Sequence, residues 1–199
     1  MSNKVKLASI ILLTVLVSAA CTTLPPVPPQ PVVNHLPPAE SGVLTDISKR
    51  ITGKLQSSES AYLLLPRNDD ALNWRLALVD HATTSIDVQY FIFQNDATGN
   101  LLFDRLLKAA DRGVRVRLLV DDIWFAPNED VIAAIDDHPN FAIKIFNPTY
   151  TRNRLGGLLE FSAYFDELNR RMHNKLFIVD NRMACLLYTS DAADECCGV

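Results

Sequence analysis

The sequence SIDVQYFIFQNDATGNLLFDRLLKAADRGVRVRLLV, residues 85–120, places a helical pattern between two apolar segments. Residues 85–93 and 114–120 are rich in β-branched and aromatic side chains, which favours strands. Between them, apolar residues recur at the spacing of one helix face, and Gly113 follows where helices commonly end. This strand–helix–strand order predicts two parallel strands, because the helix returns the chain to the same end of the sheet.

Further elements continue this pattern in both directions. Helices are expected over residues 43–56, 69–81, 129–136 and 161–171, and strands over residues 62–65 and 141–146. The helix over 69–81 is expected to bury Leu72, Leu76 and Val79. The order predicts an α/β fold with a mainly parallel or mixed sheet that is flanked by helices.

Two carboxylates follow the strand that ends at Val120. In parallel sheets, functional sites lie beyond the carboxyl ends of the strands, where Asp121 and Asp122 would be placed. Asp residues at a strand end can equally well accept hydrogen bonds from local N–H groups in a turn. The sequence leaves both roles open.

Composition excludes several classes of protein. The chain has 199 residues, 48% of them hydrophobic, which suits one domain or slightly more. Its net charge of −4 argues against a surface that binds nucleic acid by bulk electrostatics, so no nucleic-acid partner is expected. The four cysteines match neither a disulfide framework nor a metal site, and neither a metal nor another cofactor is expected.

The first twenty residues are expected to form a targeting segment. Lys4 and Lys6 precede an apolar run too short for a comfortable membrane span, and small residues then lead to Cys21. The pattern resembles a bacterial lipoprotein signal, in which Cys21 would be lipidated, although Ser18 stands where such signals usually place Leu or Val. The alternatives are a secretory signal cut after Ala20 or an uncleaved anchor. We expect a protein of the cell envelope that is anchored to a membrane and faces the periplasm.

Residues 21–40 are expected to form a stiff tether between that anchor and the folded domain. Seven of the eleven prolines lie here, at positions 25, 26, 28, 29, 31, 37 and 38. Proline-rich segments favour extended polyproline II and act as spacers. The folded domain is expected over residues 41–184, and residues 185–199 differ from it so abruptly in composition that we interpret them as an aberrant tail.

The sequence HNKLFIVD, residues 173–180, has the pattern H-x-K-x4-D on a short apolar strand. Side chains two residues apart share a face of a strand, so His173 and Lys175 would project together. A neutral imidazole can attack phosphorus, and a lysine can neutralise the phosphate oxygens in the transition state. Asp180 lies at the strand end and points to the opposite face from His173, so it is better placed to fix the turn than to contact the imidazole. An ordinary strand and turn would also fit this short pattern.

Arginines precede this motif in an otherwise acidic chain. Arg152 and Arg154 fall in an expected loop, and Arg171 ends the expected helix before His173. They are candidates for binding phosphate, although a solvated basic surface is the common alternative.

The three segments SIDVQYFIF, ADRGVRVRLLVDD and HNKLFIVD together resemble the phospholipase D superfamily, and within it bacterial cardiolipin synthases and related lipoproteins. The resemblance covers about residues 61–183 and implies a phospholipase-D-like sandwich. It implies that His173 is the nucleophile or general acid, that Lys175 binds phosphate, and that Asp180 is the third member of the motif. It also implies transfer of a phosphatidyl group through a phosphohistidine, with a phospholipid such as phosphatidylglycerol as substrate.

The chain departs from that superfamily in two respects. Superfamily enzymes combine two such motifs in one site, whereas this chain has one, and residues 185–199 lack the small-residue segment that normally follows. We therefore expect an N-terminal half that is incomplete at its C-terminus and lacks the strand after the motif. Activity would need the missing half or a homodimer. The alternatives are a homodimeric single-motif nuclease and a non-catalytic lipoprotein with a degenerate motif.

Overall fold

The computed structural model describes residues 34–122, 135, 137–149 and 168–186. The chain divides into a smaller unit of residues 1–34 and 149–169 and a larger unit of residues 35–148 and 170–199, and all the elements below belong to the larger unit. The expected signal peptide, most of the tether, the helix expected over 129–136 apart from Ile135, residues 161–167 of the helix expected over 161–171, and residues 187–199 lie outside the described residues. Residues 170 and 171 are not helical, so that helix does not extend to Arg171 as expected. None of the described helices has the length and apolar character needed to cross a membrane.

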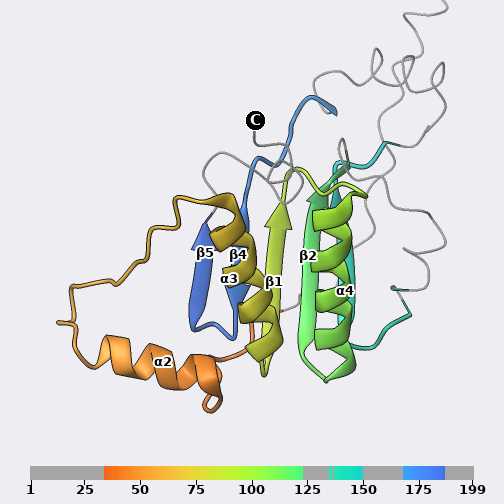
Figure 1. Ribbon diagram of the computed structural model, residues 1–199. Coiled ribbons are helices and arrows are strands. Elements are labelled where there is room, and N and C mark those ends of the chain that lie inside the picture. Colours follow the sequence, from red (N-terminus) through yellow and green to blue (C-terminus); the bar gives the residue numbers. More distant parts are fainter. Residues whose placement is uncertain (1–33, 123–134, 136, 150–167, 187–199) are drawn as a thin grey trace, which may run out of the picture. The chain divides into compact units, whose positions relative to one another are not determined.

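A five-stranded mixed sheet forms the centre of the larger unit, with strand order β3-β2-β1-β4-β5 (Figure 1). Its strands are β1 (Ser85–Tyr90), β2 (Arg115–Asp121), β3 (Phe141–Phe146), β4 (Leu176–Val179) and β5 (Met183–Leu186). β1, β2 and β3 are parallel, which confirms the prediction from residues 85–120. β4 pairs antiparallel with β1, and β5 pairs antiparallel with β4. The α/β fold with a mixed sheet is therefore confirmed.

Two helices cover one face of this sheet. α3 (Asn68–His81) and α4 (Ala97–Asp111) lie side by side on it (Figure 1). Alternate residues of the strands point into the core beneath them, since the side chains of a strand alternate between its two faces. The buried strand residues include Ile86, Val88, Val116, Leu118, Phe177 and Val179, and α4 contributes Leu102, Leu106, Ala109 and Ala110.

The buried face of α3 differs from the predicted one. The helix buries Ala71, Arg75, Leu78 and Val79, whereas Leu72 and Leu76 are only half-buried. The predicted face overlooked Arg75 because charged residues are rarely buried without a partner. Arg75 is fully buried, and its Nη1 donates a hydrogen bond of 3.3 Å to the hydroxyl of Tyr90.

Two further expectations about the N-terminal part are wrong. Residues 62–65 form no strand, and Tyr62 and Leu64 are largely exposed to solvent. No strand of the sheet pairs with these residues, so they do not form a strand despite their high β propensity. Helix α2 (Val43–Thr52) ends four residues before residue 56, because Gly53, a poor helix former, takes the C-cap position.

A hairpin joins β4 to β5, so the strand that we expected to be missing after the motif is present. Asp180 and Asn181 occupy the two central positions of its turn with φ of 55° and 50°, and the N–H of Arg182 donates to the carbonyl of Val179. Positive φ at both central positions is the type I′ geometry that suits tight hairpins. Residues 185 and 186, which we assigned to an aberrant tail, belong to β5.

The start of the folded unit is attached to this hairpin. Asn181 Nδ2 donates to the carbonyl of Leu36 at 2.7 Å, and Arg182 Nε donates to the carbonyl of Ala39 at 2.8 Å. The N–H of Ala39 donates in turn to the carbonyl of Asp180. The last residues of the expected tether are therefore fixed at the end of β4 that carries Asp180.

Candidate active site

His173 and Lys175 meet just before β4 begins. Lys175 Nζ lies 3.0 Å from His173 Nε2, although both residues precede β4 and do not belong to the strand on which we expected them. The imidazole is exposed to solvent, whereas Lys175 is only 8% exposed. An ammonium group can only donate hydrogen bonds, so a hydrogen bond between the two groups requires Nε2 as the acceptor, with its lone pair toward the lysine. The nitrogen that carries the lone pair is thus the one that faces the cation.

Phe91 contacts both members of this pair. Its ring makes an edge-type contact with the His173 ring at a centroid distance of 4.9 Å, and Lys175 Nζ lies 5.6 Å from its centroid. The negative face of an aromatic ring attracts a cation at this range. Phe91 follows β1 directly, so the strand next to β4 supplies the surface on which the pair rests.

Asp180 lies at the other end of β4 and is 1% exposed. Its carboxylate accepts hydrogen bonds from the N–H groups of Thr83, Thr84 and Ser85 and from the hydroxyls of Thr83 and Thr84, at 2.7 to 3.1 Å. These residues lead from α3 into β1. Asp180 therefore joins the β4–β5 turn to the start of β1.

These hydrogen bonds determine the ionisation of Asp180. Burial acts to raise the pKa of its carboxyl, but the backbone N–H groups of Thr84, Ser85 and Thr83 and the Thr84 hydroxyl outweigh it, and the pKa is lowered. Asp180 is thus a stable carboxylate at neutral pH, with its oxygens occupied by donors. That geometry suits the framework role that its parity in the sequence favours.

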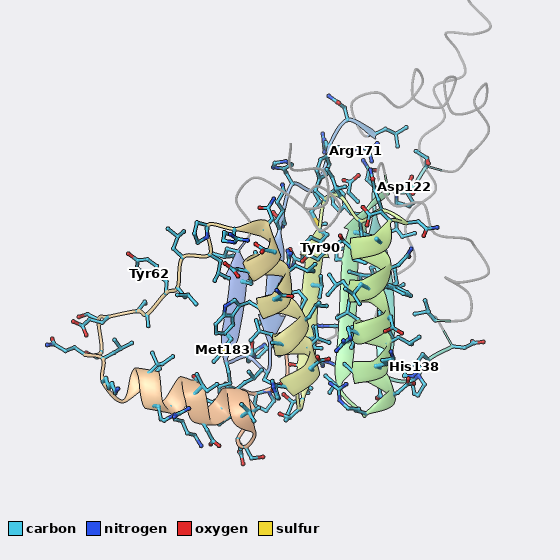
Figure 2. The ribbon with its side chains drawn as sticks, viewed as in Figure 1. Tyr62, Tyr90, Asp122, His138, Arg171 and Met183 are labelled. Atoms are coloured by element: carbon cyan, nitrogen blue, oxygen red, sulfur yellow. The ribbon has the colours of Figure 1, made fainter. Side chains whose placement is uncertain are left out.

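The residues that lead to His173 are held by Asp121. Arg171 Nη1 lies 3.1 Å from Asp121 Oδ1, and the N–H of Met172 donates to Asp121 Oδ2 at 3.0 Å. Arg171 and Asp122 lie toward the same end of the sheet as Tyr90, while His138 lies toward the opposite end (Figure 2). Asp121 thus accepts hydrogen bonds from residues about fifty positions away in the sequence, a role that the sequence did not suggest. Arg171 as a phosphate ligand stays a prediction.

Sequence reasoning overlooked Phe91 and gave Asp121 no partner. Phe91 belongs to an apolar run in which nothing distinguishes it from a core residue. Arg152, Arg154 and Cys21, the remaining predicted site residues, lie outside the described residues. Within the described ranges, no group of three or more His, Cys, Asp and Glu side chains is arranged to hold a metal ion.

The arrangement offers a nucleophile beside a fixed cation. The exposed imidazole can reach a phosphodiester, and the neighbouring ammonium can share its protons with phosphate oxygens while charge builds up on them. Asp180 is held away from this end by the length of β4. The described site thus consists of His173 and Lys175 with Phe91 beneath them.

Comparison with known proteins places most of the folded unit in one family. Residues 76–187 match the family model described as "Cardiolipin synthase, PLD-like domain". The chain is 46% identical over 118 residues to cardiolipin synthase C of Escherichia coli K12, which covers 58% of this chain and 24% of that protein. It is 41% identical over 128 residues to an uncharacterized protein of Helicobacter pylori 26695, covering 64% of this chain and 26% of that protein.

The chain spans about a quarter of the length of these curated relatives. Among solved structures, NucT from Helicobacter pylori is similar with a TM-score of 0.43 and 20% sequence identity, over 64% of this chain and 70% of NucT.

Proposed function

The chain belongs to the cardiolipin synthase family of PLD-like domains, and from that membership we propose that it contributes one half of a site that transfers phosphatidyl groups through a phosphohistidine. The proposed substrate is a phospholipid of the phosphatidylglycerol type. The observation that carries the proposal is the exposed imidazole of His173, whose Nε2 lies 3.0 Å from the buried ammonium of Lys175.

In the first step, Nε2 of His173 attacks the phosphorus of the donor lipid. A phosphorus–nitrogen bond forms, the bond from phosphorus to the leaving alcohol breaks, and the departing oxygen takes a proton from a general acid. In the second step, the hydroxyl of an acceptor alcohol or of water attacks phosphorus and gives up its proton to a base. The phosphorus–nitrogen bond then breaks, which restores the neutral imidazole.

Lys175 would stabilise charge on the phosphoryl oxygens in both steps. Its ammonium is held against Phe91 and is mostly removed from water, so its attraction for an oxyanion is little weakened by solvent. Lys175 would exchange its contact with Nε2 for a phosphate oxygen when substrate binds. That exchange would free the nucleophilic lone pair where the phosphorus arrives.

The proton of the leaving alcohol requires a second acid. The described residues contain one imidazole beside a lysine, at His173. We infer that a second H-x-K motif supplies the acid, either from a further part of the enzyme or from a second copy of this chain. Arg152, Arg154 and Arg171 are proposed to attract the anionic headgroup.

We further propose that the protein resides in the cell envelope, attached to a membrane through lipidated Cys21 and facing the periplasm. The proline-rich segment after Cys21 supports this location, which would also suit the proposed lipid substrate. Expression with a labelled fatty acid tests it: label should appear in the full chain and be absent from the Cys21→Ser variant. Label that persists in Cys21→Ser would contradict lipidation at this residue.

Lipid turnover tests the proposed reaction. Vesicles that contain phosphatidylglycerol are incubated with the full chain, and cardiolipin and phosphatidic acid are followed by mass spectrometry. We expect turnover that is lost in His173→Ala and retained in His81→Ala, a matched control because His81 is exposed at the end of α3. Turnover that survives His173→Ala would remove this residue from the mechanism. Cleavage of DNA without lipid turnover would contradict the proposal, whereas no lipid turnover by the wild-type chain would rule out a second copy of this chain as the source of the missing acid.

A further inference from the structure

The segment that delivers His173 is held by side chains rather than by a ladder. Regular pairing between β4 and β1 ends at Leu176, opposite Gln89, so residues 170–175 precede the paired strand. A backbone outside the ladder needs other partners to keep one conformation. The orientation of the imidazole therefore depends on what holds these six residues.

The segment is tied by one polar side chain from each of the three parallel strands, in their order across the sheet. Asn147, directly after β3, donates from Nδ2 to the carbonyl of Arg170 at 2.9 Å. Asp121, the last residue of β2, accepts from Arg171 and Met172. Gln89 of β1 accepts from Asn174 Nδ2 at 3.0 Å. The chain thus follows the carboxyl edge of the sheet from β3 to β1 before it enters β4.

The tie from Asp121 differs from the other two in burial and charge. Asp121 is 0% exposed, whereas the hydrogen bonds made by Asn147 and Gln89 are exposed to solvent. Hydrogen bonds to a buried carboxylate are stronger than those between neutral groups, and water cannot replace them there. The two donors are consecutive residues, so the carboxylate fixes both a side chain and the backbone directly before His173.

We propose that Asp121 is a positioning residue, whose carboxylate holds Arg171 and Met172 so that the imidazole of His173 meets Lys175 and the substrate phosphorus in one orientation. Its effect on turnover rests on the proposed function. Its effect on the geometry of the segment does not, because that follows from the hydrogen bonds alone.

The test replaces one carboxylate oxygen and leaves the shape of the side chain unchanged. In Asp121→Asn, one of the two acceptors becomes an NH2 group, so either Arg171 or the N–H of Met172 loses its acceptor whichever way the amide turns. Asp87→Asn is the matched control, because Asp87 of β1 also pairs with an arginine, Arg117 of the neighbouring strand β2. Arg171→Met is a milder second variant that leaves the hydrogen bond to Met172 intact.

Two measurements on the full chain follow the segment without requiring turnover. In Asp121→Asn we expect the Met172 amide to exchange with solvent about tenfold faster, and the nitrogen resonances of the His173 imidazole to shift, with the other core amides unchanged. Arg171→Met should shift the His173 resonances less, and Asp87→Asn should leave both readouts as in the wild type. Wild-type exchange and wild-type His173 resonances in Asp121→Asn would overturn the proposal, as would equal changes in Asp87→Asn.

Turnover provides the second arm. If the wild-type chain converts phosphatidylglycerol, Asp121→Asn should lower kcat about tenfold while KM stays within about twofold, because orientation of the nucleophile affects the chemical step more than binding. A change confined to KM would contradict positioning. Absence of turnover in the wild type would bear only on where the second motif comes from, because exchange at Met172 and the His173 resonances still decide the role of Asp121.

Discussion

The two ends of residues 173–180 have opposite environments. At one end, the carboxylate of Asp180 is buried and receives hydrogen bonds from the backbone and hydroxyl groups of Thr83 and Thr84 and from the N–H of Ser85. At the other end, the imidazole of His173 is exposed, and its nitrogen Nε2 faces Lys175. One short strand separates a group with every oxygen occupied from a group that a substrate can reach.

This difference indicates that a single sequence motif serves two separate purposes. A carboxylate surrounded by donors stabilises the joint between β1 and the β4–β5 hairpin, and it has little capacity left for a ligand. An exposed imidazole adds little to stability and remains available for chemistry. Substitutions at the two ends should therefore affect different measurements.

The largest expected effect is on activity at the His173 end. His173→Ala should lower lipid turnover by at least about 10³-fold, because the nucleophile is removed. Its free energy of unfolding, measured with urea, should stay within about 0.5 kcal/mol of the wild type, as expected for an exposed side chain. A large loss of stability in His173→Ala would show that the His173 end also contributes to folding, and would contradict the separation of the two roles.

The next effect is on stability at the Asp180 end. Asp180→Ala should lower the free energy of unfolding by about 3–5 kcal/mol, because it leaves a group of buried donors without their acceptor. Urea unfolding followed by circular dichroism measures this loss. Asp104→Ala, at an exposed i,i+4 pair with Lys108, is the control and should cost less than about 1 kcal/mol. A loss at Asp180 no larger than at Asp104 would contradict the framework role.

Acid should weaken the same joint. Because the pKa of Asp180 is lower in the folded chain than in the unfolded one, its contribution to stability is complete above the unfolded pKa of about 3.9 and is lost as pH falls through the folded pKa. Unfolding free energies measured from neutral pH downward should therefore fall more steeply below about pH 4 in the wild type than in Asp180→Asn. If the unfolding free energies of the wild type and of Asp180→Asn fall equally with pH, the loss of stability in acid does not arise from the Asp180 carboxylate.

The smallest effect is expected at Phe91, which touches the reactive pair without taking part in the reaction. Phe91→Leu keeps an apolar side chain but removes the ring that contacts His173 and Lys175. A lost cation–π contact of about 0.5–1 kcal/mol corresponds to a two- to fivefold lower kcat. Phe103→Leu, which removes a ring at a distance from the pair, is the control. Equal effects of the two substitutions would argue against a specific role for Phe91.

Local patterns were sufficient to predict much of the fold. Residues 85–120 contain their own strand, helix and strand periods, and these predicted the parallel pair of β1 and β2. The shared parity of His173 and Lys175 likewise predicted their contact. The first prediction depends on residues close in sequence, whose geometry is fixed by the backbone period. His173 and Lys175 meet in a segment that precedes β4, so the strand period alone does not account for their contact.

The remaining features depend on partners distant in the chain. Asp180 receives its hydrogen bonds from residues 83–85, and Asp121 holds residues 171 and 172, and no local period indicates either pairing. Arg75 was misplaced for the same reason, since its partner Tyr90 is on a different element. The prediction of a strand over 62–65 was wrong, because it rested on local β propensity and none of the strands that the structure describes pairs with these residues.

The most direct test of the account is to trap the covalent intermediate. The chain is mixed with a short-chain phosphatidylglycerol, quenched in alkali, in which phosphohistidine survives, and digested for mass spectrometry. We predict a phosphatidyl adduct on His173 in the wild type and in His81→Ala, and none in His173→Ala. An adduct on another residue, or lipid turnover without any adduct on His173, would contradict the central claim that the exposed end of this motif is the nucleophile.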